Sequence, residues 1–241
     1  LSCSSAASDV YKRQGNTEET LSGISDAKAN NFDWIVISSG GKLIDMAKNE
    51  GKEYIKVPSG LQPRAAFGYL TLAVSKIVDV VEGSNYVSQL NDVSLYIDEL
   101  SDKGDESDIN KLSIDICESI NKKTVIIYSG TDMSRVVSSR WKTQINENAK
   151  SKAFIGNLPE VHHNEILSWD ADKDGSKKNY IVIFIRDQNE HPQIKKRFEL
   201  TKDLIGEKVD IIEVNIANQE STLKTLLELV LLGDLVSLNL A

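Results

Sequence analysis

The stretch "TVIIYSGTDMSRVVSSRWKTQINENAKSKAFIGN" (residues 124–157) changes its hydrophobic period twice. "TVIIYSG" is a short apolar run that ends at a glycine, which is typical of a buried strand. In the segment that follows, Val137, Trp141, Ile145 and Ala149 recur at i, i+4 spacing, which predicts an amphipathic helix. "KAFIGN" then predicts a second strand. This strand–helix–strand order indicates a parallel βαβ unit and favours an α/β fold.

The same alternation continues on both sides of this stretch. Upstream, Asn16 as N-cap with Glu19 three residues into the helix forms a capping box that predicts a helix. Strands are predicted in "FDWIVISSGG", "EYIKVPSG", "NYIVIFIRD" and "VDIIEVNI", with helices between them. The sequence therefore predicts two α/β units with parallel sheets flanked by helices, joined near residue 105. We expect the polar stretch 83–110 to be a solvated connector.

Composition narrows the functional classes. The 241 residues carry 36 acidic and 28 basic side chains, a net charge of −8, which gives no sign of nucleic-acid binding. No run of about 18 apolar residues exists, which argues against a membrane span. Cys3 and Cys117 form no disulfide framework, which favours a reducing, cytoplasmic compartment.

The two ends of the chain differ from the rest. Residues 1–14, "LSCSSAASDVYKRQ", lack both periodicity and the apolar core of a secretory signal, so we expect a non-native or disordered leader. The last apolar helix runs to Ala241 with no capping glycine or polar tail. We therefore expect this chain to be the interior of a longer protein.

Small polar residues follow several of the predicted strands. Ligands of parallel sheets bind outside the carboxyl ends of strands, and Ser, Thr and Gly let N–H and hydroxyl groups approach an oxyanion closely. None of the loops matches GxxxxGK[ST] or GxGxxG. We expect the four loops to share one sheet edge and to hold a polar anion: "GNTEET", "SSGG", "PSGLQPR" and "YSGTDMS".

Two charged side chains are candidates for chemistry. Glu147 shares a predicted helix face with Arg140, Thr143 and Lys150. That face is either a solvated surface with i,i+4 pairing, or a base kept ionised by neighbouring cations. Arg64 follows a proline and is either a surface cap residue or a guanidinium aimed at developing negative charge.

His162 and His163 are adjacent, and adjacent helical residues point about 100° apart, so both cannot face one small site. The zinc motif HExxH is also absent, so we expect no metal site. We expect one histidine to be a buried hydrogen-bond partner and the other to be exposed. The exposed one could act on a substrate proton.

Several segments together resemble one family, the bifunctional phosphoglucose/phosphomannose isomerases, which are built from two sugar isomerase (SIS) domains. The resemblance covers residues 15–241. It rests on "GNTEETL", "SSGGKL", "PSGLQPRAAFGY", "SSRWKTQINENAK", "AFIGNLPEVHHNEILSW" and "LLGDLVSLNLA". The pairing of "NEN" with "HNE", sixteen residues beyond its Glu, is specific when it occurs beside "QPR" and "GNTEET".

The resemblance implies two flavodoxin-like SIS domains, with the sugar phosphate bound between them. The first is partial at residues 15–82; a helical connector follows at 83–110, and the second occupies 111–241 without its last helix. The resemblance also implies an isomerase of glycolysis and gluconeogenesis. Such an enzyme interconverts glucose 6-phosphate and mannose 6-phosphate with fructose 6-phosphate through a cis-enediolate. No metal or organic cofactor is implied, nor any nucleic-acid or membrane partner. The family is homodimeric with shared active sites.

Roles for individual residues also come from the resemblance. Glu147 resembles the base that moves a proton between C1 and C2, and Arg64 resembles the enediolate stabiliser. His163 resembles the ring-opening residue that the partner subunit supplies. Thr17, with Asn16 and Gly15, resembles the phosphate-binding loop.

The chain also departs from the family pattern. Lys12 and Gln14 stand where the family has two phosphate-binding serines, and the sequence stops before a helix that carries an active-site Thr and Lys. We therefore expect the chain as written to be inactive by itself. Two alternatives stay open: a non-catalytic sugar-phosphate-binding SIS module, and an amidotransferase-type domain, for which no glutamine-hydrolysing domain is seen.

Overall fold

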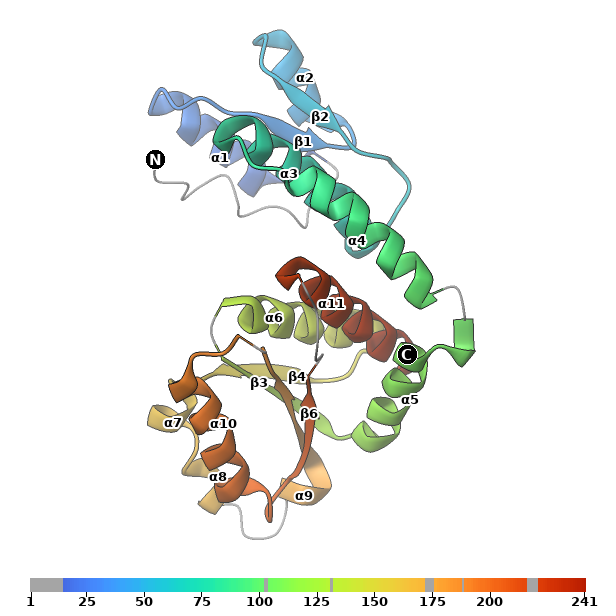
Figure 1. Cartoon of the computed structure of the whole chain (residues 1–241). Helices are drawn as coiled ribbons and strands as arrows, with labels where there is room; N and C mark the ends of the chain where they lie inside the picture. Colours follow the sequence, from blue (N-terminus) through green and yellow to red (C-terminus); the bar gives the residue numbers. More distant parts are fainter. Residues whose placement is uncertain (1–14, 102–103, 131, 172–175, 188, 216–220) are drawn as a thin grey trace. The chain divides into compact units, whose positions relative to one another are not determined.

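The structure is a computed structural model that describes residues 15–101, 104–130, 132–171, 176–187, 189–215 and 221–241 (Figure 1). The chain divides into two compact units, Leu1–Asn91 and Asp92–Ala241. The expected leader, including Lys12 and Gln14, lies outside the described residues. Within the described part of the chain, no helix is both long and apolar enough to cross a membrane.

The first unit contains a two-stranded parallel sheet, formed by β1 (Val36–Ser38) and β2 (Tyr54–Lys56), with Ile37 opposite Ile55. Because successive strand residues point to opposite faces, each face has its own core. Val36 packs with side chains of α1 (Glu18–Ala29) and α2 (Gly41–Asn49). Ile37 and Ile55 pack against the cluster built by the short η1 (Pro63–Ala66) and by α3 (Phe67–Glu82).

Helix α1 begins one residue later than predicted. Its N-cap is Thr17, so the assignment of Asn16 as N-cap is wrong. The Asn16 side chain is used elsewhere: its Oδ1 accepts a hydrogen bond from the backbone N–H of Lys42, at 3.0 Å. A tertiary contact has thus displaced the local capping preference.

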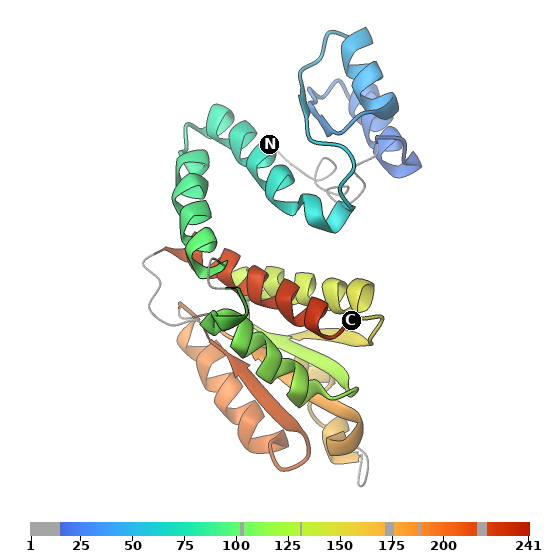
Figure 2. The same ribbon diagram turned by 90° about the vertical axis from the view of Figure 1, so that its right-hand side faces the viewer.

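The polar stretch after α3 is an ordered helix, α4 (Tyr86–Ser101), followed by the short η2 (Gly104–Glu106) (Figure 2). Asp79 caps the start of α4, because its carboxylate accepts from the backbone N–H of Tyr86 at 2.7 Å and of Val87 at 2.9 Å. Ser84 donates to the same carboxylate at 2.6 Å. These bonds lower the pKa of Asp79 even though partial desolvation opposes the shift.

The second unit contains a four-stranded parallel sheet in the order β4-β3-β5-β6. In this order the strands are Ala153–Asn157, Thr124–Ser129, Tyr180–Ile185 and Asp210–Val214. Ile127 of β3 lies opposite Ile155 of β4 and Ile183 of β5. The predicted α/β fold with parallel sheets is therefore confirmed.

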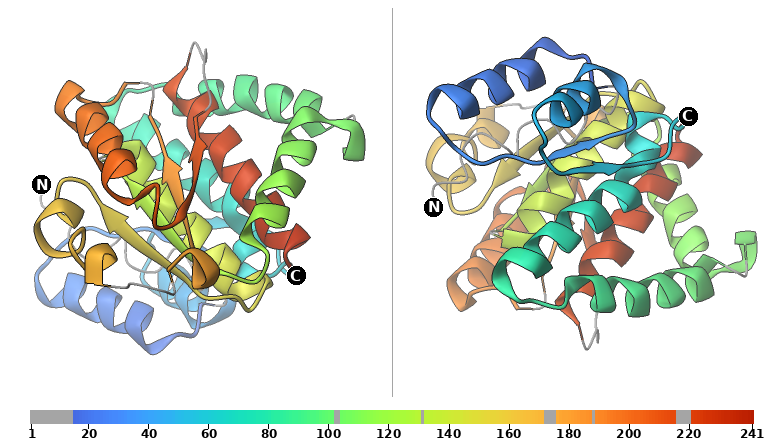
Figure 3. Two further views of the ribbon diagram at one scale, coloured as in Figure 1. Left: turned by 90° about the horizontal axis from the view of Figure 1, so that it is seen from below. Right: turned by 90° about the horizontal axis from the view of Figure 1, so that it is seen from above.

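Helices cover both faces of this sheet (Figures 1 and 3). One face carries α5 (Asp108–Ile120), α6 (Asp132–Asn148) and α11 (Thr222–Asn239). The other carries α7 (Val161–Asn164), α8 (Ser168–Ala171) and α10 (Pro192–Ile205), while α9 (Ser176–Asn179) leads into β5. The two central strands, β3 and β5, are buried between these layers and are accordingly apolar on both sides.

Helix α6 packs through the predicted stripe. Val137, Trp141 and Ile145 are fully buried, whereas Ala149 lies just past the end of the helix and is half-buried. The Trp141 indole N–H donates to the carbonyl of Leu229 in α11 at 2.8 Å. Helix α11 therefore packs directly against α6.

The packing of α11 against α6 corrects the prediction for Arg140. Its side chain does not lie on a solvated or cleft-lining face with Glu147, because it is buried against α11. There it makes a two-point ion pair with Asp234, and Gln144 donates to the same carboxylate at 2.8 Å. The helical spacing predicted the right helix but could not show that α11 covers this side of it.

Candidate active site

The predicted phosphate loop, Gly15 to Thr17, is fixed to the carboxyl end of β1. The backbone N–H of Leu43 donates to the Gly15 carbonyl at 3.1 Å, in addition to the bond between Lys42 and Asn16. Gly15 has a φ of +68°, and a Cβ there would lie 2.1 Å from the Gly40 carbonyl oxygen. Only glycine fits such a position, so packing alone requires Gly15 here.

Donor groups gather around this loop. Thr17 stands at the N-terminus of α1, where backbone N–H groups and the helix dipole favour an anion. Its hydroxyl is hydrogen-bonded to that of Thr20 at 2.7 Å. Sequence reasoning named the "SSGG" loop but no residue in it. Ser38 is buried there, and its hydroxyl holds the turn by donating to the Gly40 carbonyl at 2.9 Å.

Arg64 belongs to the same unit and to the same edge of its sheet. It follows β2 in η1, directly after Pro63, which occupies the first helical position. Its side chain is half-buried. The loop before α1 and the loop after β2 therefore bring a helix N-terminus and a guanidinium to one edge of this sheet, as expected of a site for an anion.

The fourth loop, "YSGTDMS", does not share that edge. It follows β3 in the other unit, so the expectation that all four loops lie at one sheet edge is wrong. Its described hydroxyls are engaged internally: Ser134 accepts from the Gly130 N–H at 3.1 Å, and Ser129 bonds to Ser138 at 3.0 Å. Loops rich in Ser, Thr and Gly follow strands in both units. The sequence alone therefore could not show that this loop belongs to a different sheet from the other three.

Glu147 lies in the last turn of α6, and its side chain is exposed. The backbone around it is well fixed, because the Lys150 ammonium donates to the Glu147 carbonyl at 2.7 Å and Asn146 accepts from the N–H of Ala153 at 2.9 Å. The second of these bonds ties the end of α6 to the start of β4. Glu147 thus presents a carboxylate to solvent from a rigid support.

The two histidines divide their roles as predicted. His162 is half-buried, and its Nε2 bonds to the hydroxyl of Thr201 at 2.7 Å while Arg197 approaches its Nδ1 at 3.1 Å. Thr201 donates its own proton to the Arg197 carbonyl, so Nε2 of His162 carries the ring proton and Nδ1 accepts. Desolvation and the Arg197 charge lower the pKa of His162. His163 is exposed.

Within one chain, Glu147 and His163 belong to opposite edges of the sheet. Helix α6 starts beyond the carboxyl end of β3 and ends beside the amino end of β4, so Glu147 lies at the amino edge. His163 follows the carboxyl end of β4. The five residues of β4 alone place these edges roughly 13 Å apart.

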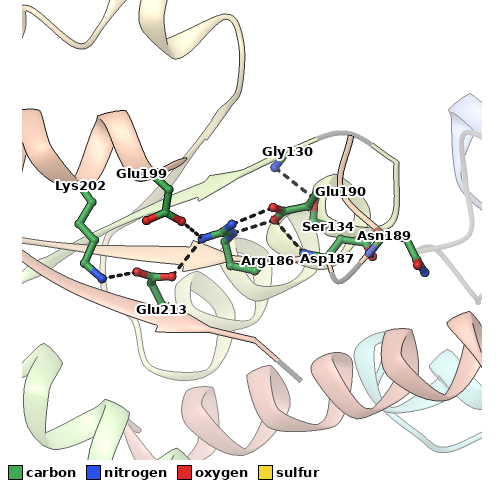
Figure 4. Close-up of polar contacts among 9 residues, drawn as sticks. All are labelled: Gly130, Ser134, Arg186, Asp187, Asn189, Glu190, Glu199, Lys202 and Glu213. Carbon is green, nitrogen blue, oxygen red and sulfur yellow. Dashed lines mark hydrogen bonds and ion pairs between the residues drawn. The ribbon is translucent and has the colours of Figure 1, made fainter. Parts of the chain in front are cut away.

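A cluster around Arg186 also lies at the carboxyl edge of the second sheet (Figure 4). The Arg186 side chain is buried and makes a two-point ion pair with Glu190 at 2.8 and 2.9 Å. Glu199 and Glu213 also accept from it, at 3.3 and 3.0 Å. Desolvation opposes the charge, but these carboxylates raise the pKa of Arg186 overall. Three carboxylates already neutralise this guanidinium, so it is not suited to hold an anionic substrate.

Within the described ranges, no group of three or more His, Cys, Asp or Glu side chains is placed to hold a metal ion.

Comparison with known proteins adds independent information. The family model for the bacterial phospho-glucose isomerase C-terminal SIS domain matches residues 109–241. The chain is 34% identical over 230 residues to the bifunctional phosphoglucose/phosphomannose isomerase of Aquifex aeolicus, covering 94% of this chain and 67% of that protein. A relative of the same name from Caldicellulosiruptor bescii is 34% identical over 232 residues, covering 94% and 68%.

A solved structure shares the fold at low identity. Glucosamine-6-phosphate deaminase from Thermotoga maritima superposes with a TM-score of 0.64 at 16% identity, over 94% of this chain and 66% of that chain. The chain thus spans about two thirds of the length of the curated relatives that it matches.

Proposed function

The chain belongs to the family of bifunctional phosphoglucose/phosphomannose isomerases, and on this premise we propose that the protein is an aldose–ketose isomerase. Its substrates are glucose 6-phosphate and mannose 6-phosphate, both converted reversibly to fructose 6-phosphate. The observation that carries this proposal is the 34% identity to a protein of that name over 94% of the chain. The proposed reaction belongs to central hexose metabolism and takes place in the cytoplasm.

In the proposed mechanism, Glu147 is the base. Its carboxylate removes the proton from C2 of the open-chain aldose, giving a cis-enediolate, and returns it to C1. A hydroxyl proton passes from O2 to O1 in the same conversion, which completes the ketose. The proton and electron pair stay on the sugar and the enzyme, so no redox cofactor is needed. The exposed carboxylate on a rigid helix end supports this role, and general base catalysis of this kind contributes roughly 10²- to 10⁴-fold in rate.

Arg64 and the loop Gly15 to Thr17 stabilise the negative charges of the substrate. The Arg64 guanidinium stabilises the oxyanion that develops as the enediolate forms. The N-terminus of α1, together with the Thr17 hydroxyl, binds the phosphate of the substrate. The hydrogen bond from Lys42 to Asn16 and the close packing of Gly15 support this assignment, because they fix the loop before a ligand arrives.

His163 opens the sugar ring by moving the proton between the ring oxygen and the C1 hydroxyl, and we propose that a second copy of the chain supplies it. Glu147 and His163 of one chain belong to opposite sheet edges, which supports a homodimer with shared sites. The division of the histidine pair also supports it, since His162 is engaged with α10 and His163 is exposed.

The test of the base is hydrogen exchange in the complete gene product. Fructose 6-phosphate is incubated in D₂O with wild-type protein or with Glu147→Gln, and deuterium in the products is followed by NMR. We expect the variant to lose exchange roughly 10²- to 10⁴-fold. Glu207→Gln, an exposed carboxylate in another turn, is the control and should exchange normally. Normal exchange by Glu147→Gln contradicts the assignment, and binding of fructose 6-phosphate without turnover by the wild type favours the non-catalytic SIS module.

A further inference from the structure

Tertiary contacts determine the orientation of helix α7, which carries His163. Helix α7 is four residues long, and a single helical turn is not stable without tertiary contacts. The direction of the His163 imidazole therefore depends on the side chains that anchor this turn. Two sets of contacts do so, one from strand β3 and one from helix α10.

The anchor on β3 is Tyr128. Its hydroxyl donates to Oε1 of Glu165, the residue that ends α7, and accepts from the Trp169 indole N–H at 3.0 Å. Tyr128 is fully buried, and its ring stacks against Phe184 with centroids 6.3 Å apart. One hydroxyl, fixed in the middle of the core, therefore holds the end of α7 and the start of α8 together.

The neighbouring strand leaves room for this anchor. A Cβ on Gly156 of β4 would lie 2.8 Å from Cε1 of Tyr128 and 2.7 Å from Cγ2 of Val161. Either contact is shorter than real Cβ atoms allow, so a side chain at 156 would displace the tyrosine or the first residue of α7. Because Gly156 has no side chain, the ring of Tyr128 and the side chain of Val161 can both pack against this position.

The anchor on α10 is the pair of bonds from His162 to Thr201 and Arg197. Helix α7 is consequently held from two sides, through His162 and through Glu165. His163 lies between these two residues in the sequence and is exposed. The backbone that carries its imidazole is therefore held on both sides.

We propose that Tyr128 is a positioning residue which, through Glu165, fixes the direction of His163 for opening the sugar ring. The inference rests on the proposed function, because it assumes that His163 performs that step. Tyr128 itself does not touch the substrate. Burial, followed by the hydrogen bond and charge of Glu165, raises the pKa of Tyr128, so its hydroxyl stays protonated and remains a donor across the physiological range.

The test is a double-mutant cycle in the complete gene product, with Tyr128→Phe, His163→Asn and the two combined. The rate is measured from glucose 6-phosphate, which must be opened, and from fructose 6-phosphate, which has a larger open-chain fraction in water. We expect Tyr128→Phe to lower kcat from glucose 6-phosphate about tenfold, because small displacements of a reacting group are costly. KM should be unchanged, and the loss from fructose 6-phosphate smaller. In the His163→Asn background the same change should cost nothing further.

Two controls separate positioning from general damage. Tyr180→Phe alters another tyrosine, whose ring packs against Trp169 at 6.0 Å, and should leave the rate unchanged. Glu165→Gln keeps an acceptor for the Tyr128 hydroxyl and should retain most of the activity. If the Tyr128→Phe loss adds in full to that of His163→Asn, or if Tyr128→Phe is as active as wild type, the positioning role is wrong. If His163→Asn itself is fully active, the ring-opening assignment fails instead.

Discussion

Arg140 of α6 and Asp234 of α11 form a two-point ion pair, with Nε to Oδ1 at 3.1 Å and Nη2 to Oδ2 at 2.6 Å. The Arg140 side chain is 7% exposed and that of Asp234 is 30% exposed. The two residues are 94 positions apart in sequence, and their pairing fixes α6, the helix whose last turn carries Glu147. Loss of Asp234 would remove this carboxylate from a buried guanidinium, which is costly.

We therefore expect Asp234→Ala to lower the free energy of unfolding of the chain by about 3 kcal/mol, at the lower end of the range for buried pairs because Asp234 is partly exposed. Urea denaturation followed by circular dichroism measures it. Asp170→Ala is the matched control: this carboxylate pairs with Lys208 but is 65% exposed, so its loss should cost less than about 1 kcal/mol. Equal shifts for the two variants would show that Arg140 is not buried as described.

Gly233 and Trp141 give a second test of the contact between α6 and α11. A Cβ on Gly233 would lie 2.2 Å from Nε1 and 2.3 Å from Cδ1 of Trp141, whose indole is fully buried. We expect Gly233→Ala to destabilise the chain by about 1–3 kcal/mol, the usual cost of overpacking. It should also shift the tryptophan fluorescence.

Gly68→Ala is the control for Gly233. Gly68 lies in the first turn of α3, and a Cβ there meets nothing within 4 Å. Alanine at this position should be neutral or stabilising by up to about 1 kcal/mol, because glycine is a poor helix former. If both alanine variants were equally stabilising, α6 and α11 would not pack as closely as described.

Much of this fold follows from local patterns. The short apolar runs predicted each strand near its observed place, and for β3 and β5 this is because a strand buried on both faces needs no more than a continuous apolar segment. The stripe Val137, Trp141 and Ile145 was also visible, since it depends only on the 3.6-residue period. The division of the histidine pair followed from the 100° between neighbours on a helix.

Two of the wrong predictions share one cause, which is that each depended on a contact distant in sequence. Asn16 was expected to cap its own helix but bonds to Lys42. Arg140 was expected on an open face but meets Asp234. For the candidate site, the residue types at 64, 147 and 163 could be read from motifs. The anchoring of α7 by Tyr128 could not, because no local pattern links position 128 to position 165.

The pH dependence of stability tests the environment of His162. Desolvation and Arg197 lower its pKa below the ordinary value of 6.5. Between its folded and unfolded pKa values, the unfolded chain binds more protons at this site, so stability increases with pH through that window. The contribution of His162 is therefore complete above pH 6.5 and is lost as the pH falls through the folded value.

We expect the difference in urea midpoint between wild type and His162→Gln to be larger at pH 7.5 than at pH 5. His163→Gln serves as the control, because this side chain is exposed and the same change should have little effect at either pH. An identical difference at the two pH values would contradict the assignment of His162 as a neutral, anchored histidine.

The most direct test of the account concerns sharing of the active site between two subunits. Glu147→Gln and His163→Asn are made separately in the complete gene product, and each variant should be nearly inactive. The two inactive proteins are then co-expressed so that hybrid dimers form. If His163 acts in the site of the other subunit, half of the dimers are hybrids and each hybrid has one intact site, so about a quarter of wild-type activity should return. If activity stays at the level of the single variants although hybrid dimers are present, the two side chains do not meet across subunits, and the central claim is wrong.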